Sequence, residues 1–382
     1  MALSGFADEP PRKLVKVSTN AALPKPMAAG AAFLCESANV PDGFGYYLAL
    51  EANRHLLPKE KPETAIAVLP ESAGFLRNGD ILRLSVRGGT YRVVFRSQCR
   101  HTTILLTERC NHYCLMCSQP PRDVNDDWII DEVERLIPML PTSAREIGFT
   151  GGEPTLYEDR LIRLLEQTKR CLPRTAVHML TNGRRFADRA FTHAYASVNH
   201  PDLMVGIPVY SDDPVHHNFV VQADRAFDET MGGILNLKRL GQRVEIRVVI
   251  HRQTIDRLPQ LAEFIGRNLL FVDKVALMGL EITGFTRGNL GKLWIDPFDY
   301  RETLEEAVDI LSAYRVPTAV YNHQLCVVTD RVRAFCVQSI SDWKNEYLPV
   351  CSSCEVRSEC GGFFSSSVKY RHSDHISPKA RA

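Results

Sequence analysis

Three cysteines fall within eight consecutive residues, and their spacing is the clearest chemical signal in the sequence. Cys110, Cys114 and Cys117 form the pattern Cys-x3-Cys-x2-Cys in the segment CNHYCLMC. Thiolates are the soft ligands that zinc and iron–sulfur clusters take. With His112 as a fourth ligand, the loop would make a Cys3His zinc site. Ligands this close on one tight loop match zinc motifs poorly, whereas three thiolates suit three corners of a cubane cluster and would leave its fourth iron open.

A second group of cysteines lies towards the end of the chain. Three of them form CSSCEVRSECGG, and the spacing Cys-x2-Cys-x5-Cys again indicates metal binding, either by zinc or by a second iron–sulfur cluster. A four-ligand site needs one more cysteine, and two candidates precede these three. Cys326 follows the strand-like PTAVYN, and Cys336 lies in RVRAFCVQ, which could form one face of a helix.

The first element that positions these groups is a small β-containing region. In DILRLSVRGGTYRVVFRS, two alternating strand-like runs flank Gly88 and Gly89, and this is a β-hairpin signal. We assign no fold to the stretch before residue 75. Residues 1–98 are therefore predicted to form a small N-terminal β-containing module.

Six strand–helix units follow, starting at residue 101. The first strands are TTILLT, EIGFTGG and AVHMLTNG, and an amphipathic helical segment follows each of them. Such alternation predicts parallel strands joined by crossover helices, and six units are too few for a closed eight-stranded barrel, which needs about 250 residues. We predict an α/β fold with a partial (β/α)6 TIM barrel over residues 99–315 and a cysteine-rich domain over residues 316–382.

Polar or glycine-rich segments follow the first four predicted strands. In α/β barrels the chemistry lies at the carboxyl ends of the strands, because their loops converge there. Any one of these segments alone would be interpreted as a plain turn, but together on one edge they predict a site. The four segments begin at Cys110, Gly151, Thr181 and Ser211.

The cysteine triplet resembles the signature of the radical S-adenosylmethionine (SAM) superfamily. The segment TGGEPTLY, with Gly151, Gly152, Glu153 and Pro154, is similar to the glycine-rich turn of that family and also follows the second strand. The resemblance implies a [4Fe–4S] cluster on the three cysteines, with SAM chelated by the open iron and its amino group bound at the turn. Reductive cleavage of SAM would give a 5′-deoxyadenosyl radical that takes a hydrogen atom from substrate. Met116 stands where the family often has an aromatic residue.

The same resemblance implies further contacts to SAM. Asn182 follows the third strand, Ser211 and Asp212 follow the fourth, and Arg247 lies near the end of the fifth, where similar proteins contact the ribose and carboxylate of the cofactor. As an alternative, these residues are turn residues and surface charges. Glu281 comes directly after the sixth strand and is the preferred proton acceptor for a substrate.

Three other polar residues near strand ends are weaker candidates for contact with substrate, and structural roles are preferred for the last two. They are Tyr210, His251 and Asp296.

The C-terminal cysteines Cys351, Cys354 and Cys360 resemble part of the SPASM pattern, an auxiliary-cluster domain of radical SAM enzymes. The match is partial, because the full pattern has more cysteines and two clusters, so the resemblance implies one auxiliary [4Fe–4S] cluster. Cys326 resembles the first cysteine of such domains and is chosen over Cys336 as the fourth ligand.

More closely, LLTERCNHYCLMCSQPPR, SISDWKNEYLP and CGGFF resemble the HxsC family of His-Xaa-Ser system radical maturases over most of residues 79–366. This resemblance implies an enzyme that modifies a ribosomally synthesised precursor peptide beside a partner maturase, with electrons from an external donor. It does not identify the peptide or the bond that is formed. The N-terminal module could bind a leader peptide at a sheet edge by strand addition, or act as a lid.

Composition limits the kinds of partner. Lys and Arg number 46 against 45 Asp and Glu, and the net charge of +1 makes nucleic acid an unlikely partner. A radical SAM enzyme that modifies tRNA or rRNA remains an alternative, because local basic pairs such as Arg331 and Arg333 occur. A scaffold protein held together by zinc and without enzymatic activity is a weaker alternative, because the glycine-rich turn would then have no purpose.

The sequence also allows a prediction of where in the cell the protein is located. No run approaches the roughly 20 apolar residues of a membrane-spanning helix. The odd total of 11 cysteines and their grouping indicate metal binding in a reducing compartment, so we expect a cytoplasmic protein. Three cysteines have no partners at metal-binding spacing and are interpreted as buried apolar residues, namely Cys35, Cys99 and Cys171.

Overall fold

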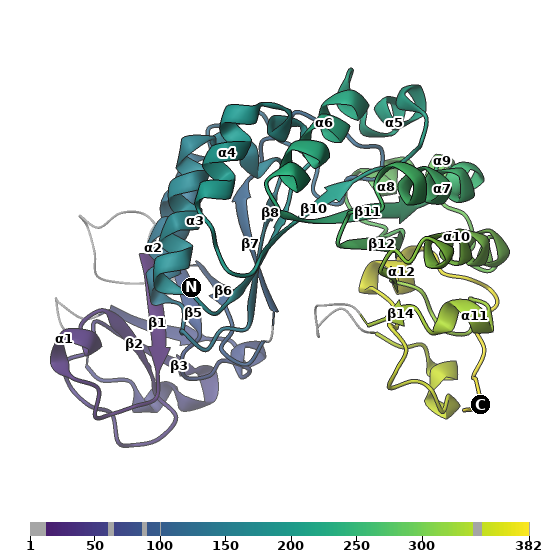
Figure 1. Cartoon of the computed structure of the whole chain (residues 1–382). Helices are drawn as coiled ribbons and strands as arrows, with labels where there is room; N and C mark the ends of the chain where they lie inside the picture. The colour runs from purple at the N-terminus through teal and green to yellow at the C-terminus, as the bar shows by residue number, and fades with distance from the viewer. Residues whose placement is uncertain (1–12, 60–64, 86–89, 100, 339–345, 382) are drawn as a thin grey trace. The chain divides into compact units, whose positions relative to one another are not determined.

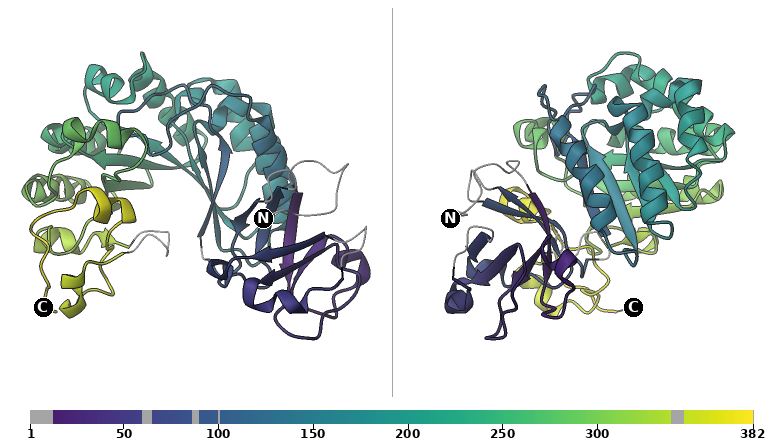
Figure 2. Two further views of the ribbon diagram at one scale, coloured as in Figure 1. Left: turned by 180° about the vertical axis from the view of Figure 1, so that it is seen from behind. Right: turned by 90° about the vertical axis from the view of Figure 1, so that its left-hand side faces the viewer.

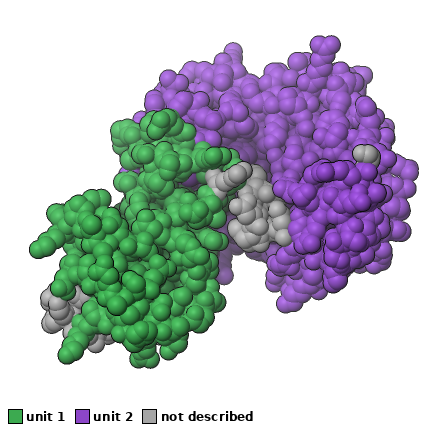
Figure 3. All heavy atoms as spheres, turned by 90° about the horizontal axis from the view of Figure 1, so that it is seen from below, with its two compact units in different colours: residues 1–104, 131–146, 170–175 green, residues 105–130, 147–169, 176–382 purple. Residues whose placement is uncertain are grey.

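The computed structural model describes most of the 382-residue chain, namely residues 13–59, 65–85, 90–99, 101–338 and 346–381. The chain divides into two compact units, which Figure 3 shows in separate colours. Unit 1 comprises residues 1–104, 131–146 and 170–175, and unit 2 comprises residues 105–130, 147–169 and 176–382. Both cysteine groups therefore lie in unit 2.

Unit 1 contains a six-stranded sheet in the order β4-β3-β2-β1-β5-β6. The first four strands in sequence pair in parallel, and β5 pairs antiparallel with both β1 and β6. One face of the sheet packs into an apolar core around Val15, Leu48 and Leu82. The strands are β1 (Lys13–Ser18), β2 (Ala31–Leu34), β3 (Tyr46–Leu50), β4 (Ala65–Leu69), β5 (Ile81–Ser85) and β6 (Thr90–Phe95).

The predicted hairpin corresponds to the antiparallel pair β5 and β6. Its two central glycines, Gly88 and Gly89, lie outside the described residues. The four parallel strands before it were not predicted, because each is short and its apolar residues are interrupted by Pro, Gly and Ala rather than alternating regularly. Short helices in this region are α1 (Lys25–Ala28), η1 (Glu51–Leu56) and η2 (Glu71–Ala73).

The second sheet has eight strands, and their order in space follows the sequence from β7 to β14. The pairings from β9 to β14 are all parallel. This curved sheet is the partial (β/α)6 barrel predicted from the sequence, and the α/β fold is confirmed. The strands are β7 (His101–Thr107), β8 (Glu146–Gly151), β9 (Ala176–Leu180), β10 (Leu203–Pro208), β11 (Arg243–Ile250), β12 (Lys274–Gly279), β13 (Thr318–Tyr321) and β14 (Cys336–Val337).

Crossover helices cover the convex face of this sheet, as Figures 1 and 2 show. An apolar stripe is buried against the sheet in several of them; in α3 the stripe includes Leu161, Leu164 and Leu165. The larger helices are α2 (Asp127–Leu136), α3 (Asp159–Cys171), α4 (Arg189–Ser197), α5 (Pro214–Val221), α6 (Ala226–Arg239), α7 (Leu258–Asn268) and α10 (Arg301–Ala313). The shorter ones are α8 (Phe285–Gly288), α9 (Leu290–Leu293), α11 (Asp330–Arg333) and α12 (Ser365–Tyr370).

Short 3-10 helices cap or connect several of these elements. They are η3 (Ile137–Met139), η4 (Pro154–Tyr157), η5 (Arg184–Ala187), η6 (Ile255–Arg257) and η8 (Pro349–Ser353). No helix in the described part of the chain is long and apolar enough to cross a membrane.

The cysteine-rich region is continuous with the barrel rather than separate from it. Strand β13 pairs in parallel with β12, and β14 pairs with β13, so the sheet runs past the predicted boundary at residue 315. Residues 316–382 accordingly belong to the same compact unit as the barrel. The interpretation of RVRAFCVQ as one helical face is wrong, because α11 ends at Arg333 and Cys336 begins β14.

Candidate functional site

The cysteine loop, residues 108–118, begins where β7 ends, and other parts of unit 2 hold it by its main chain. The amides of Tyr113 and Leu115 donate to the carbonyls of Val221 and Val220 at 3.1 and 3.0 Å. These carbonyls lie at the end of α5, an element that the sequence did not reveal as a helix. Helix α5 therefore fixes one side of the loop.

Helices α8 and α9 hold the loop from the other side. Thr286 Oγ1 donates to the carbonyl of Met116 at 3.1 Å, and Asn289 Nδ2 donates to that of Leu115 at 2.9 Å. Both contacts use main-chain carbonyls of the loop rather than its thiols. A loop held in this way keeps its sulfur atoms available for ligation.

Gly284 allows the chain before α8 to approach the third cysteine. Its φ is +53°, and a Cβ there would lie 2.3 Å from the carbonyl oxygen of Cys117. The amide of Phe285 donates to that same carbonyl at 2.9 Å. Only glycine fits this approach without displacing the loop.

Asp126 fixes the base of the cysteine loop. Its Oδ2 accepts from Thr107 Oγ1 at 2.8 Å and from the amide of Glu108, and its Oδ1 accepts from Arg109 Nε at 2.9 Å. Burial acts to raise the pKa of this carboxyl, but these donors outweigh it and the pKa is lowered. No local motif marks Asp126 in the sequence, because its partners come from the end of β7.

The glycine-rich turn packs directly against the start of the cysteine loop. A Cβ on Gly152 would lie 1.9 Å from the carbonyl oxygen of Arg109, and one on Gly151 would lie 2.3 Å from that of Thr107. The amides of Gly152 and Glu153 donate to these two carbonyls, each at 2.8 Å. Gly151 and Gly152 thus have a packing role, whatever the cysteine loop binds. The expectation that the glycine-rich turn would have no purpose in a scaffold held together by zinc is therefore wrong.

Glu153 is buried and joins two strand-end loops. Its Oε1 accepts from the amide and hydroxyl of Thr155 and from Thr181 Oγ1, at 3.0, 2.6 and 2.7 Å, and its Oε2 accepts from the amide of Asn182 at 2.6 Å. Burial raises the pKa of Glu153, and the hydrogen bonds oppose that rise. Pro154 is also buried and begins η4. Four hydrogen-bond donors of this chain therefore engage the carboxylate of Glu153, which lies in the turn predicted to bind the amino group of SAM.

Asn182 connects the β9 loop to the cysteine loop. Its Nδ2 donates to Asn111 Oδ1 at 2.6 Å, and its Oδ1 accepts from the amide of Arg184 at 3.1 Å. Arg184 in turn pairs with Glu229 at 2.6 Å. The structure therefore places Asn182 beside the cysteine loop, as its position after the third strand suggested.

Ser211 and Asp212 follow β10 as predicted, but their side chains take part in local structure. Ser211 Oγ accepts from the amide of Asp213 at 3.1 Å, and Asp213 caps α5 through the amide of Val215. Asp212 forms a two-pronged ion pair with Arg257, at 2.9 and 2.6 Å. These contacts agree with the alternative interpretation, in which Ser211 is a turn residue and Asp212 is a surface charge.

Arg247 lies in the middle of β11 rather than near its end. Its Nη1 donates to Glu245 Oε1 at 2.7 Å, and its Nη2 donates to Met278 Sδ at 3.0 Å. Glu245 also faces Lys274 Nζ at 3.4 Å and His178 Nε2 at 3.6 Å. The structure thus assigns Arg247 to a charged network between neighbouring strands, so the predicted strand-end position is wrong.

Buried rings pack beside the cysteine loop. Tyr210 stacks on His217 with ring centroids 6.0 Å apart, and its amide donates to His217 Nδ1 at 3.2 Å. His251 lies 6.5 Å from the Tyr210 ring, and His112 Nδ1 lies 4.0 Å from Cys114 Sγ. Burial lowers the pKa of His112 and His251 to about 3 and that of His217 to about 4, so these rings are neutral at neutral pH.

The remaining candidates differ in their surroundings. Glu281 lies two residues beyond β12, between that strand and α8, and is partly buried. Asp296 is buried and accepts from the amides of Phe298 at 2.9 Å and Asp374 at 3.4 Å. Asp296 therefore has a structural role, as preferred from the sequence.

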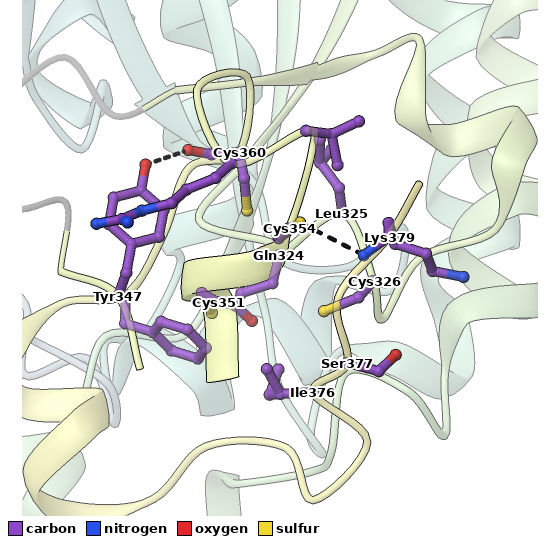
Figure 4. A pocket seen from close by; sticks show the side chains of 13 residues that line it. Gln324, Leu325, Cys326, Tyr347, Cys351, Cys354, Cys360, Ile376, Ser377 and Lys379 are labelled. Atoms are coloured by element: carbon purple, nitrogen blue, oxygen red, sulfur yellow. Dashed lines mark hydrogen bonds between the residues drawn. The ribbon is translucent and has the colours of Figure 1, made fainter. Parts of the chain in front are cut away.

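The second cysteine group surrounds one pocket, shown in Figure 4. Four thiol-bearing residues line it, namely Cys326, Cys351, Cys354 and Cys360. Cys336 is not among the lining residues, and its Sγ donates to the carbonyl of Val332 at 3.6 Å. The pocket thus contains the four cysteines named as the ligand set, drawn from two separate stretches of the chain.

Main-chain donors and aromatic residues complete this pocket. Lys379 N donates to Cys354 Sγ at 3.4 Å, and Tyr347 OH donates to the carbonyl of Cys360 at 2.9 Å (Figure 4). Burial raises the pKa of the Cys326 and Cys360 thiols. The segment SISDWKNEYLP, which supported the family resemblance, falls largely on residues 339–345, outside the described residues.

Both donor sets fit iron–sulfur clusters in their chemistry. Burial raises the pKa of Cys110 to about 12 and, more strongly, that of Cys114, and neighbouring thiols add to the rise in Cys114. Because ligation needs thiolates, metal loading would release protons at both sites. A cubane offers a separate iron to each cysteine, so its ligands need not converge on one point. Across the described ranges, no three His, Cys, Asp or Glu side chains are grouped closely enough for one metal ion.

Fold and site together define an α/β half barrel with a three-cysteine loop at the carboxyl edge of its sheet. Residues 104–265 match the Radical SAM superfamily. This match covers less than half of the chain and agrees with the resemblance of its cysteine loop.

Curated relatives are similar over part of the chain. A probable GTP 3′,8-cyclase of Sulfurisphaera tokodaii is 26% identical over 211 residues, covering 54% of this chain and 62% of that protein. GTP 3′,8-cyclase 2 of Mycobacterium tuberculosis is 31% identical over 147 residues, covering 36% of this chain and 38% of that protein. The chain thus spans less than two thirds of the length of these relatives.

A solved structure supports the fold alone. Native anSMEcpe with bound AdoMet is 14% identical, with a TM-score of 0.50 over 72% of this chain and 92% of that one.

The residues that sequence reasoning missed are mainly those that hold the cysteine loop by its main chain. Their partners are distant in sequence, and no local motif marks them. They are Asp126, Val220, Val221, Gly284, Thr286 and Asn289.

Proposed function

We propose that this protein is a radical SAM enzyme with two [4Fe–4S] clusters that modifies a ribosomally synthesised peptide. One cluster is held by Cys110, Cys114 and Cys117, and an auxiliary cluster is held by the four cysteines of the second pocket. The observation that carries the proposal is the cysteine loop at the carboxyl edge of the half barrel, fixed through main-chain carbonyls and amides.

The chemistry divides between the bound groups and the chain. When bound, the cluster and SAM supply a 5′-deoxyadenosyl radical that abstracts a hydrogen atom from substrate. Gly151 and Gly152 place their main chain against the loop, and Glu153 and Asn182 tie the neighbouring strand ends together. The neutral buried rings around Tyr210 keep water from the loop. Glu281 is the residue proposed to accept a proton from substrate.

Two features support a peptide as the substrate. The motifs around both cysteine groups resemble those of peptide maturases of the His-Xaa-Ser systems. The sheet of unit 1 ends on one side in β4 and on the other in β6, and an edge strand can bind an extended peptide by strand addition. A partner maturase, an external electron donor and a cytoplasmic location belong to the same proposal.

A second candidate follows from the curated relatives. They are named GTP 3′,8-cyclases, so a purine nucleotide is an alternative substrate of the same radical chemistry. Incubation of the reconstituted enzyme, SAM and reductant with either GTP or a synthetic peptide of His-Xaa-Ser repeats separates the two. Mass spectrometry should detect a change in the peptide and leave GTP intact. The opposite pattern would refute peptide modification but not the radical SAM assignment.

The cluster assignment is tested by iron and sulfide analysis after anaerobic reconstitution. Wild type should bind about eight irons per chain and form 5′-deoxyadenosine, because each cubane contains about four irons. The triple variant Cys110→Ala, Cys114→Ala, Cys117→Ala should bind about four and form none. Zinc in place of iron would refute the proposal.

The role of Glu281 needs a readout that separates cofactor cleavage from substrate chemistry. Glu281→Gln should impair modification of the substrate and leave uncoupled formation of 5′-deoxyadenosine unchanged. Asp299→Asn, in the exposed turn before α10, is the matched control and should affect neither. Equal loss of both activities in Glu281→Gln would exclude a proton-accepting role.

A further inference from the structure

The segment Ser373–Arg381 lies against the four-cysteine pocket. Ile376, Ser377 and Lys379 are among the residues that line it, and Figure 4 shows them beside the sulfur atoms. This segment follows α12 and contains no helix or strand. It therefore meets the pocket as irregular chain, and the Lys379 main-chain N–H is directed at Cys354 (Figure 4).

A main-chain N–H group of this segment donates to one of the four sulfurs. Lys379 N lies 3.4 Å from Cys354 Sγ. Ile376 and Ser377 line the same pocket as Cys326. The segment thus contacts one cysteine directly and forms part of the wall that surrounds the others.

Contacts at both ends hold the segment in place. His375 stacks on Phe298 with ring centroids 3.8 Å apart. Arg381 pairs with Glu359 at 2.6 Å, and the Glu355 amide donates to the carbonyl of Lys379 at 3.0 Å. His375, Arg381 and the side chains that they contact do not line the pocket, so both ends of the segment are held independently of the cysteines.

We propose that Ser373–Arg381 is a strap that sets the reduction potential of the auxiliary cluster, chiefly through the Lys379 N–H on Cys354 Sγ. The inference rests on the proposed function, which assigns a cluster to this pocket. Hydrogen bonds to cluster sulfurs are one of the means by which proteins tune iron–sulfur potentials. Reduction adds negative charge to the cluster, and an N–H donor stabilises it, so the bond raises the potential. Lys379 is a positioning residue that acts through its main chain.

A pair of substitutions at residue 379 isolates this hydrogen bond. Lys379→Pro removes both the N–H and the side chain, because proline has no amide hydrogen, whereas Lys379→Ala removes the side chain and keeps the N–H. Both changes are made in the full-length Cys110→Ala, Cys114→Ala, Cys117→Ala variant, so that only the auxiliary cluster contributes to the spectrum. Redox titration followed by electron paramagnetic resonance gives the midpoint potential.

The expected result is a lower midpoint potential for Lys379→Pro and an unchanged one for Lys379→Ala. Equal potentials in the two variants would overturn the strap while leaving the auxiliary cluster intact. Absence of iron from the parent triple variant, with iron present in wild type, would instead refute the auxiliary cluster and the strap with it. Circular dichroism of each variant confirms that the fold is retained.

A second pair keeps the test decisive if proline prevents cluster binding. Arg381→Ala loosens the far end of the strap by removing its ion pair with Glu359, without touching a pocket cysteine. Arg331→Ala breaks a similar exposed ion pair, with Asp309 at 2.6 Å, elsewhere on the surface. A smaller drop in potential for Arg381→Ala and none for Arg331→Ala is expected. Identical potentials in these two variants would overturn the proposal.

Discussion

The two cysteine sites are built in different ways. In the first, three thiols come from eight consecutive residues of the cysteine loop, and neighbouring loops and helices hold that loop by its main chain. In the second, four thiols come from two stretches of chain, and the strap Ser373–Arg381 lines the pocket. The first site therefore depends on the fit of the loops around it, and the second depends on bringing distant cysteines together.

The difference in ligand number has a chemical consequence. Three thiolates leave one corner of a cubane free, which is the position a chelating cofactor needs. Four thiolates occupy every corner, so a cluster in the second pocket has no free iron for substrate. The proposed enzyme would thus separate cofactor binding at the first site from electron transfer at the second.

The largest expected effect tests the ligand set of the second site. Cys326→Ser should remove the auxiliary cluster and lower the iron content from about eight to about four per chain, because a cubane holds about four irons. Cys336→Ser should keep all of it, because Cys336 does not line the pocket. Iron and sulfide analysis after anaerobic reconstitution measures both variants. Loss of iron in Cys336→Ser with retention in Cys326→Ser would reverse the assignment.

The next effect tests the fit of loops around the first site. Gly152→Ala places a methyl group 1.9 Å from the Arg109 carbonyl, so the cysteine loop must move. We expect a loss of about 3 kcal/mol in the free energy of unfolding and loss of iron from the first site alone. Chemical denaturation and iron analysis provide the measurements.

Gly232→Ala is the matched control, since its Cβ would meet no atom closer than 3.6 Å and it lies in a helix. This change should stabilise the chain slightly, by up to about 1 kcal/mol. If Gly152→Ala instead kept full stability and iron, the close packing of the turn against the loop would not be required.

The sequence predicted the strand–helix order because its signals are local. Amphipathic segments such as DRLIRLLEQTKRCL carry their own periodicity, and α3 spans nearly the same residues. The cysteine triplet and the glycine-rich turn were likewise visible as short motifs. Helix α5 was not, because its amphipathic pattern is weak and Val215 and Phe219 are exposed.

The parts that could not be predicted depend on long-range contacts. Asp126 meets Thr107 across 19 residues, and Thr286 meets Met116 across 170. Neither pair belongs to a motif. The position of Arg247 was wrong for a different reason, because the predicted strand VEIRVVI already spanned nearly the same residues as β11 and Arg247 lies in the middle of both.

A smaller effect tests the buried carboxylate at the base of the loop. Asp126→Asn keeps the side-chain shape but removes the charge that faces Arg109, and we expect a loss of about 2 kcal/mol in the free energy of unfolding. The folded pKa of Asp126 is lowered, so its contribution is present above the unfolded value of about 3.9 and disappears as the pH falls through the folded pKa. Unfolding at pH 7 and below pH 4 checks this.

Asp127→Asn is the control for that change. Asp127 also pairs with Arg109, at 2.9 Å, but its side chain is 52% exposed. Its loss should cost less than about 0.5 kcal/mol at any pH, because water screens an exposed pair. Equal costs for the two variants would mean that burial of Asp126 contributes nothing to the loop.

The smallest effect concerns a single hydroxyl on the far side of the loop. Thr286→Val removes the buried donor to the Met116 carbonyl and should cost about 1 kcal/mol, the usual net value of a buried hydrogen bond. Thr283→Val is a control three residues away, since the buried Thr283 hydroxyl has no hydrogen-bond partner among the described residues and its replacement should be neutral or stabilising. Chemical denaturation compares the two. A larger cost for Thr283→Val would mean that apolar packing, rather than hydrogen bonding to the main chain, holds this side of the cysteine loop.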